Sequence, residues 1–151
     1  MKISEIMARN VQTTTPEATL KESLEILTKE RLNGLVVVEG NKVVGVVTKA
    51  DIFRAILPTQ CDICEDELLM KDPEYVEERI FKFLGIRVEK IMGTPPVTTS
   101  SNVPIVKAGS MMVLRRIKQV PVVDDGALVG IVTLSDILSA LRKKSEGFGT
   151  V

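Results

Sequence analysis

The chain has 151 residues, of which 44% are apolar, enough material to bury a hydrophobic core. Lysine and arginine together number 20, as do aspartate and glutamate, so no net charge favours a nucleic acid or a membrane surface as a partner. Because histidine is absent, an enzyme could use no imidazole base, catalytic triad or histidine metal ligand and would have to work with carboxylates or lysines alone.

Three further absences narrow the class of protein. The sequence has no secretory signal and no apolar run of about 18 residues, so we expect a cytoplasmic protein without a membrane span. Two cysteines are too few for a secreted disulfide framework. No glycine-rich loop ends in Gly-Lys-Ser or Gly-Lys-Thr, which argues against a P-loop enzyme.

The first third of the chain reads as a small mixed α and β unit. Thr19 begins a Thr-x-x-Glu capping pattern, and leucines recur on one face of the helix that follows. Gly40-Asn41 separates two β-rich runs, as expected for a hairpin. The predicted elements are a strand around Val11–Thr14, a helix from Thr19, strands over Leu35–Glu39 and Val43–Thr48, and a helix over Asp51–Leu57.

The middle segment, Pro58–Arg87, is longer than a plain connector, and Tyr75–Phe83 is predicted to form a short amphipathic helix. Cys61 and Cys64 have the spacing of a zinc half-site, but a structural zinc needs four ligands. One chain offers neither a second cysteine pair nor a histidine, so we expect no metal site here. A four-thiolate site shared across a dimer and a redox disulfide are the alternatives.

The last third repeats the order of the first. Pro104 occupies the place of Thr19, and proline is tolerated in the first turn of a helix. Asp125-Gly126 supplies the second hairpin signal. The predicted elements are a helix near Ile105–Arg116, strands over Val120–Val123 and Leu128–Thr133, a helix over Asp136–Lys143, and a loose tail over Lys144–Val151.

An internal repeat accounts for this similarity, since Ile3–Ile56 aligns without a gap with Val88–Leu141. A unit this small buries too little surface alone, so the two copies are expected to cover each other's sheets about a pseudo-two-fold axis, leaving equivalent clefts. The predicted fold class is α/β (α+β). Its predicted organisation is repeat 1 over 1–57, a helical connector over 58–87, repeat 2 over 88–143 and a flexible tail over 144–151.

The order of motifs in both copies resembles the cystathionine-β-synthase (CBS) domain family. Ile-Met is followed by Thr-Thr, a helix, Pro-Val-Val-Asp and Gly-x-x-Thr-x-x-Asp. The second copy fits at Val120–Asp124 and Gly130–Asp136, whereas the first has Val36 for the proline and Glu39 for the aspartate. The resemblance implies two βαββα units paired as a Bateman module, which binds AMP, ADP, ATP or S-adenosylmethionine and regulates other proteins.

The resemblance also implies two clefts, each combining both copies, in which the motif aspartate accepts hydrogen bonds from ribose and the threonine lies near ribose or phosphate. Glu89 would repel phosphate in the second cleft unless Lys49 and Lys118 offset it, so we favour the first. The first cleft would join Ser4, Ala8, Arg9, Leu32 and Asn33 to Thr133, Ser135 and Asp136; the second would join Glu89, Gly93, Thr94, Ile117 and Lys118 to Thr48, Lys49 and Asp51.

Several of these residues also have a purely structural interpretation. Thr48-x-x-Asp51 and Thr133-x-x-Asp136 are ordinary helix starts, in which a threonine caps and an acid meets the positive end of the helix dipole. Arg9 and the two lysines are typical solvated surface residues. Leu32 and Ile117 are typical core residues.

The resulting hypothesis is a regulatory module without catalytic activity and without a cofactor or metal. It would bind an adenine nucleotide (AMP, ADP or ATP), form a homodimer, and transmit binding as a conformational change to a partner protein whose identity the sequence does not give. The alternatives are an S-adenosylmethionine sensor and a ligand-free scaffold for interaction or dimerisation.

Overall fold

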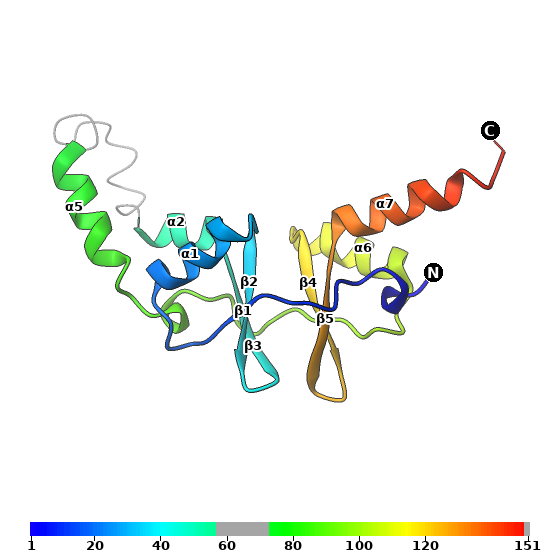
Figure 1. The fold of residues 1–151 in the computed structure, drawn as a ribbon, viewed down its shortest axis with the longest axis horizontal. Coiled ribbons are helices and arrows are strands. Elements are labelled where there is room, and N and C mark those ends of the chain that lie inside the picture. The colour runs from blue at the N-terminus through cyan, green and yellow to red at the C-terminus, as the bar shows by residue number, and fades with distance from the viewer. Residues whose placement is uncertain (57–72, 150–151) are drawn as a thin grey trace. The chain divides into compact units, whose positions relative to one another are not determined.

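A computed structural model describes residues 1–56 and 73–149 of the chain, coloured from blue to red in Figure 1. The chain divides into two compact units. Unit 1 comprises Met1–Val11, Gly40–Val43 and Pro96–Val151, and unit 2 comprises Gln12–Glu39 and Val44–Pro95. Each unit therefore contains most of one repeat together with the first segment of the other repeat.

Unit 2 is built around a three-stranded sheet with the strand order β1-β2-β3. β1 pairs with β2 in parallel, with Thr13 opposite Val36. Helix α1 begins at the predicted cap, where the Thr19 hydroxyl accepts the N–H of Glu22 at 3.2 Å. The elements are β1 (Thr13–Thr14), α1 (Leu20–Lys29), β2 (Gly34–Glu39), β3 (Lys42–Thr48), α2 (Lys49–Ile56), α5 (Pro73–Phe83) and the 3-10 turn η2 (Val88–Lys90).

Unit 1 carries the second hairpin, in which β4 and β5 pair antiparallel. Asp125 and Gly126 have positive φ values of 50° and 78°, as a two-residue turn of type I′ requires. Thr99, which aligns with Thr14 of β1, forms an isolated parallel bridge to Val122, so among the described residues the second copy has no strand that corresponds to β1. The elements are η1 (Ile3–Glu5), α6 (Ile105–Arg115), β4 (Gln119–Asp124), β5 (Ala127–Thr133) and α7 (Leu134–Ser145).

Each unit has its own aliphatic core, and each core includes one residue from the first segment of the other repeat. Ile3 is fully buried among residues of the second repeat, and Val88 is fully buried among residues of the first. Figure 1 shows the blue N-terminal segment running beside α6 in unit 1. The core of unit 1 is Ile3, Ile105, Ala108, Met112, Val120, Val122, Val132 and Ile137; that of unit 2 is Leu20, Leu27, Leu35, Val37, Val47, Ile52 and Val88.

Backbone hydrogen bonds attach these segments to the hairpins. Ala8 and Ile131 exchange two N–H to carbonyl bonds, both of 2.9 Å. Gly93 and Val46 form the equivalent pair in unit 2, at 2.9 and 3.4 Å. The compact units consequently do not follow the boundaries of the sequence repeats, and the domain limits inferred from the sequence stay a prediction.

The observed helices and strands begin and end within about two residues of the predicted ones. Helix α7 continues through Ser145, two residues into the predicted tail. An ion pair of 2.7 Å between Arg142 and Glu146, together with basic residues at the negative end of the helix dipole, stabilises this last turn. The connector forms α5 as expected, whereas Cys61 and Cys64 lie outside the described residues.

Candidate functional site

The Thr133-x-x-Asp136 motif forms the first turn of α7. The Thr133 hydroxyl accepts the N–H of Asp136 at 3.1 Å, and Oδ2 of Asp136 accepts the N–H of Thr133 at 2.8 Å. This reciprocal arrangement is a capping box, so the capping role considered from the sequence is present. It holds the Asp136 side chain in one orientation, which is also what a ligand contact requires.

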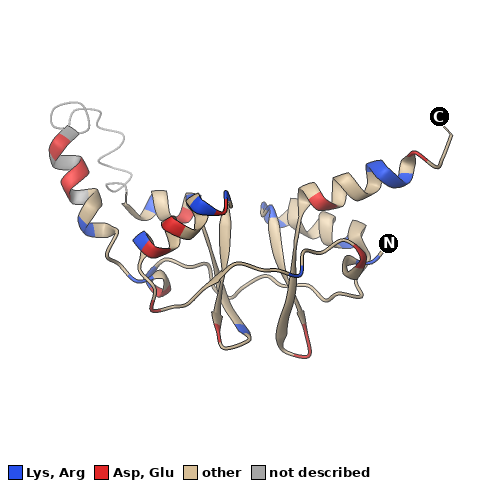
Figure 2. Cartoon of the chain, in the orientation of Figure 1, with Lys and Arg blue, Asp and Glu red and all other residues tan. Residues whose placement is uncertain are grey.

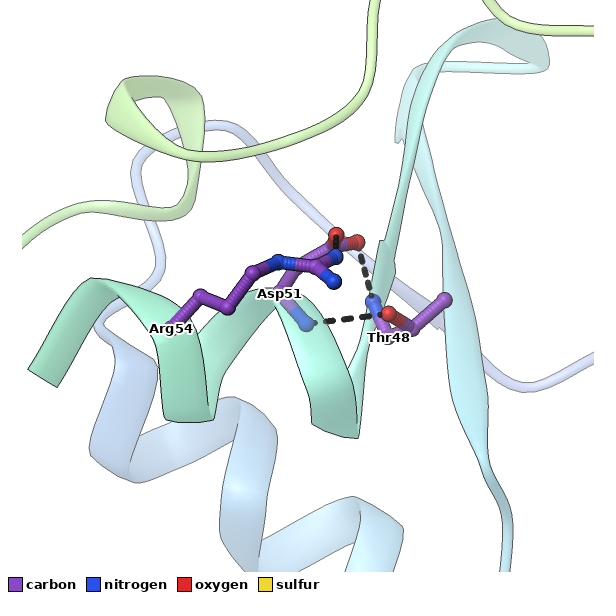
Figure 3. A network of polar contacts seen from close by, with 3 residues as sticks. All are labelled: Thr48, Asp51 and Arg54. Carbon is purple, nitrogen blue, oxygen red and sulfur yellow. Dashed lines mark hydrogen bonds and ion pairs between the residues drawn. The ribbon is translucent and has the colours of Figure 1, made fainter. Parts of the chain in front are cut away.

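The equivalent motif in unit 2 has the same geometry at the start of α2 (Figure 3). Thr48 accepts the N–H of Asp51 at 3.1 Å, and Oδ2 of Asp51 accepts the N–H of Thr48 at 2.9 Å. A third residue completes the cluster, because the Arg54 guanidinium donates to Oδ1 of Asp51 at 2.7 Å. Both carboxylate oxygens of Asp51 therefore have a protein partner.

Asp136 differs from Asp51 at its second oxygen. In the repeat alignment, Ser139 stands at the position of Arg54. Within the described part of the chain, Asp136 makes its side-chain hydrogen bonds through the capping box, and Oδ1 has no ion pair. Because a carboxylate oxygen accepts up to two hydrogen bonds, Oδ1 of Asp136 is available to a ligand donor such as a hydroxyl group.

The residues before each β-hairpin lie beside the motif helix of their own repeat. The N–H of Lys49 donates to the carbonyl of Asn33 at 2.8 Å, and the N–H of Leu134 donates to the carbonyl of Lys118 at 2.9 Å. The Asn33, Lys49 and Lys118 side chains are exposed to solvent. Asn33 thus lies beside Thr48 and Asp51, and Lys118 lies beside Thr133 and Asp136.

Leu32 and Ile117 follow the ends of α1 and α6. The N–H of Ile117 donates to the carbonyl of Met112, and the N–H of Leu32 donates to that of Leu27, which closes each helix. Both side chains are half-buried against the hydrophobic cores of their units. Their packing matches the core interpretation, and a role against adenine stays a prediction.

The segment near the N-terminus contributes Ser4, Ala8 and Arg9 to unit 1. Ser4 is half-buried, whereas Ala8 and Arg9 are exposed. The Arg9 guanidinium donates to the carbonyl of Ser4 at 3.5 Å. Since Ala8 is bonded to Ile131 in β5, the structure brings this segment to the hairpin that leads into Asp136.

The equivalent segment of unit 2 contains Glu89, Gly93 and Thr94, all exposed. Gly93 is bonded to Val46 in β3, the strand that leads into Thr48. The Glu89 carboxylate lies 3.8 Å from the Arg87 guanidinium, which partly offsets its negative charge. Ser135, in the first turn of α7, is exposed as well.

The structure thus unites two subsets of the predicted site residues. Unit 1 contains Ser4, Ala8, Arg9, Ile117, Lys118, Thr133, Ser135 and Asp136, and unit 2 contains Leu32, Asn33, Thr48, Lys49, Asp51, Glu89, Gly93 and Thr94. The expected combinations of Leu32 and Asn33 with Asp136, and of Ile117 and Lys118 with Asp51, draw on both units and stay predictions.

A pocket of about 590 Å³ lies on unit 1 beside Asp136. The sequence analysis did not identify the other residues that line it. The lining residues from α7 follow Asp136 at intervals of three and four residues, which places them on the same face of the helix. This spacing could have identified them from the sequence. The lining residues are Met1, Glu5, Ile6, Asp136, Ser139, Ala140, Lys143 and Lys144.

Asp124, the aspartate of the Pro-Val-Val-Asp motif, has a structural contact. Oδ1 of Asp124 accepts the backbone N–H of Ser101 at 3.0 Å. Hydrogen bonds from the Ser101 side chain and backbone hold the pKa of Asp124 below its ordinary value. This aspartate therefore anchors the segment before α6 to the end of β4.

Nowhere in residues 1–56 and 73–149 do three or more His, Cys, Asp or Glu side chains gather as metal ligands would. Among the same residues, every helix is too short or too polar to cross a bilayer.

Comparison with known proteins supports the repeat. The model of the CBS domain family matches twice, at residues 3–58 and 88–143. An uncharacterised protein of Methanocaldococcus jannaschii is 30% identical over 136 residues, covering 81% of this chain and 80% of that protein. Several other curated relatives are longer, and this chain spans about a quarter to a third of their length.

Solved structures share the fold. A CBS domain pair in complex with 5′-methylthioadenosine and S-adenosyl-L-methionine is 25% identical, with a TM-score of 0.69 over 95% of this chain and 98% of that one. A second protein, solved in complex with AMP, is 22% identical, with a TM-score of 0.72 over 95% of this chain and 98% of that one. The mixed α and β fold with two repeats is confirmed by these similarities.

Proposed function

Because the chain belongs to the CBS domain family, we propose that it is a regulatory module that binds an adenine nucleotide beside Asp136 and transmits binding to a partner protein. It acts by binding, without catalysing a reaction. The nucleotide's ribose hydroxyls donate to Asp136, and the two conformations that the partner distinguishes differ in their affinity for the nucleotide.

One observation carries this proposal: the capping box orients Asp136, and within residues 1–56 and 73–149 its Oδ1 has no ion pair, at the edge of a pocket of about 590 Å³. A charged acceptor held in a fixed orientation binds hydroxyl donors more strongly than a neutral one. Ser4, Ala8 and Arg9 belong to the same unit as Asp136, and the proposal assigns them to the adenine or the phosphate. The AMP complex of a structurally similar protein supports the choice of ligand class.

We also propose that the protein forms a homodimer through α6 and α7. Exposed apolar side chains concentrate on α6 and α7, where Val113 is 66% exposed and Leu138 is 59% exposed. Apolar surface of this kind is typical of protein–protein contacts. A second copy of the chain would cover it, and nucleotide binding in unit 1 would then be sensed at the dimer contact.

Two alternative functions have specific support. An S-adenosylmethionine sensor is favoured by the similar CBS domain pair that was solved with that ligand. A ligand-free scaffold is favoured by the capping boxes, since both Thr/Asp pairs already have partners within the chain. The proposal predicts that an adenine nucleotide raises the melting temperature of the protein, and the first alternative predicts that S-adenosylmethionine does. The scaffold alternative predicts that no ligand raises it.

Thermal shift with AMP, ADP, ATP, S-adenosylmethionine and NAD tests these functions against one another. A ligand at 100 times its dissociation constant adds about 2.7 kcal/mol to the free energy of unfolding. The proposal expects a rise in melting temperature with an adenine nucleotide. A rise with S-adenosylmethionine alone would favour the first alternative, and no shift with any compound at millimolar concentration would favour the scaffold.

Mass spectrometry of the purified protein under non-denaturing conditions complements the thermal shift. The expected species is a dimer in which some or all of the proposed sites retain an adenine nucleotide. A monomer at micromolar concentration would contradict the proposed dimer without affecting the ligand assignment, because the two are detected as separate mass differences.

A further inference from the structure

The pocket on unit 1 follows one face of α7 away from Asp136. From this helix it is lined by Asp136, Ser139, Ala140, Lys143 and Lys144, whose spacing places them on successive turns of the same face. The other lining residues come from the N-terminal segment and are Met1, Glu5 and Ile6. A ligand bound at Asp136 therefore has a continuous path along the helix.

Charge changes along that path. Figure 2 shows an acidic position near the beginning of α7 and basic positions near its end. Because an α-helix rises about 1.5 Å per residue, Lys143 lies about 10 Å along the axis from Asp136. The two ends of the pocket thus suit two different groups of one ligand: hydroxyl donors at the acid and anionic oxygens at the ammonium groups.

We infer that the site of unit 1 takes a nucleoside polyphosphate, whose phosphate chain lies along α7 and whose terminal phosphates meet Lys143 and Lys144. The inference rests on the proposed function, since it takes Asp136 as the ribose contact. A single phosphate next to the ribose lies near the Ser139 turn. Each additional phosphate extends toward the lysines and gains a charge-assisted contact.

The first repeat lacks this basic pair. Continuing the repeat alignment past Ile56 and Leu141 places Pro58 and Thr59 at the positions of Lys143 and Lys144. The sequence after Asp51, the motif aspartate of unit 2, therefore has no counterpart of the Lys143-Lys144 pair. Preference for a polyphosphate is expected to be a property of the Asp136 site.

Glu5 opposes the anionic ligand. It lines the same pocket, and its carboxylate accepts the N–H of Lys2. A carboxylate near phosphate weakens binding, by an amount that falls as salt screens the charges. The substitution Glu5→Gln keeps the hydrogen-bond acceptor and removes the charge, so it is expected to strengthen ATP binding by about twofold to fivefold.

Isothermal titration calorimetry with adenosine, AMP, ADP and ATP tests the inference. For the wild-type protein the expected affinity rises with each added phosphate. The double variant Lys143→Met/Lys144→Met is expected to bind ATP about tenfold more weakly and adenosine within about twofold of wild type. Methionine keeps the length and helix propensity of the lysine side chain, so the fold of α7 is retained.

Arg142→Met is the matched control. Arg142 is the neighbouring cation on α7, but it pairs with Glu146 and does not line the pocket. Its ATP affinity is expected to stay within about twofold of wild type. An equal loss in the control and in the lysine variant would overturn the inference, since it would indicate a general effect of net charge.

The remaining outcomes separate the inference from the proposed function. If AMP binds as tightly as ATP, or if the lysine variant keeps the wild-type ATP affinity, the phosphate path along α7 is wrong while the nucleotide site stands. If neither adenosine nor any of its phosphates binds, the proposed function itself fails, and the inference fails with it.

Discussion

The Arg54 guanidinium donates a hydrogen bond of 2.7 Å to Oδ1 of Asp51, whereas Oδ1 of the counterpart Asp136 has no ion pair in the part of the chain that the structure describes. The two motif aspartates are otherwise held alike, each in a capping box with the threonine three residues before it. Arg54 is 71% exposed and the Asp51 side chain 25% exposed, so the pair can open at modest cost. The two repeats therefore present inequivalent acceptors to a ligand.

Arg54→Ala is expected to strengthen nucleotide binding in unit 2. An exposed ion pair is worth about 0.2–1 kcal/mol, so releasing Oδ1 of Asp51 raises the affinity by at most about fivefold. Calorimetry in an Asp136→Ala background isolates this site. The reverse substitution, Ser139→Arg, should weaken binding in unit 1. If Arg54→Ala instead abolished binding in unit 2, the arginine would be a phosphate contact and the interpretation would be wrong.

Gly130→Ala is expected to destabilise unit 1. A Cβ atom at this position would lie 2.7 Å from Sδ of Met7 and 2.9 Å from the carbonyl oxygen of Ala8. The methionine can move, but the carbonyl belongs to the bonded pair with Ile131, so the segment must shift. Overpacking of this kind costs about 1–3 kcal/mol. The midpoint of urea denaturation measures the loss.

Gly109→Ala is the control for that substitution. Gly109 lies inside α6, and its Cβ would be 3.5 Å from Cδ1 of Ile137, an ordinary contact distance. Alanine in a helix interior is favoured over glycine by about 0.5–1 kcal/mol, so this variant should be more stable than wild type. Equal stability of Gly130→Ala and wild type would show that the N-terminal segment is not held against β5.

The pKa of Asp124 makes stability depend on pH. Because Ser101 lowers this pKa in the folded state, the carboxylate contributes stability that is fully present above the unfolded-state pKa. That contribution is lost as the pH falls through the folded-state pKa. Ser101→Ala removes the side-chain hydrogen bond, so the Asp124 pKa measured by NMR titration should rise toward its ordinary value. An unchanged pKa would contradict the assigned cause.

Much of the fold could be predicted because local signals and the internal repeat agree. The Thr19 cap, the Asp125-Gly126 turn and the apolar spacing of the helices each depend on neighbouring residues, and each appears in the structure. The packing of Ile3 with the second repeat and of Val88 with the first could not be read from such signals. Which repeat the first segment of each copy packs against depends on contacts between residues far apart in sequence.

The candidate site was predictable to a similar extent. The repeated Gly-x-x-Thr-x-x-Asp motif identified Asp51 and Asp136, and the structure places both at helix starts. Their inequivalence depends on Arg54 and Ser139, one turn further along each helix, where the motif carries no information. Lys143 and Lys144 lie beyond the motif altogether, and only the pocket relates them to Asp136.

A thermodynamic cycle between Asp136 and the ribose hydroxyls determines whether this carboxylate binds the nucleotide. Affinities of ATP and 2′,3′-dideoxy-ATP are measured by calorimetry for the wild-type protein and for Asp136→Ala. Any loss that comes from the broken capping box affects both nucleotides equally and cancels. For wild type, ATP should bind at least about tenfold more tightly than the dideoxy analogue, since hydrogen bonds to a charged acceptor are worth about 1.5–3 kcal/mol each.

In Asp136→Ala that preference should disappear, leaving the two nucleotides within about twofold of each other. If the variant retained the wild-type ratio between ATP and its dideoxy analogue, Asp136 would act only as a helix cap, and the proposed nucleotide site would be wrong.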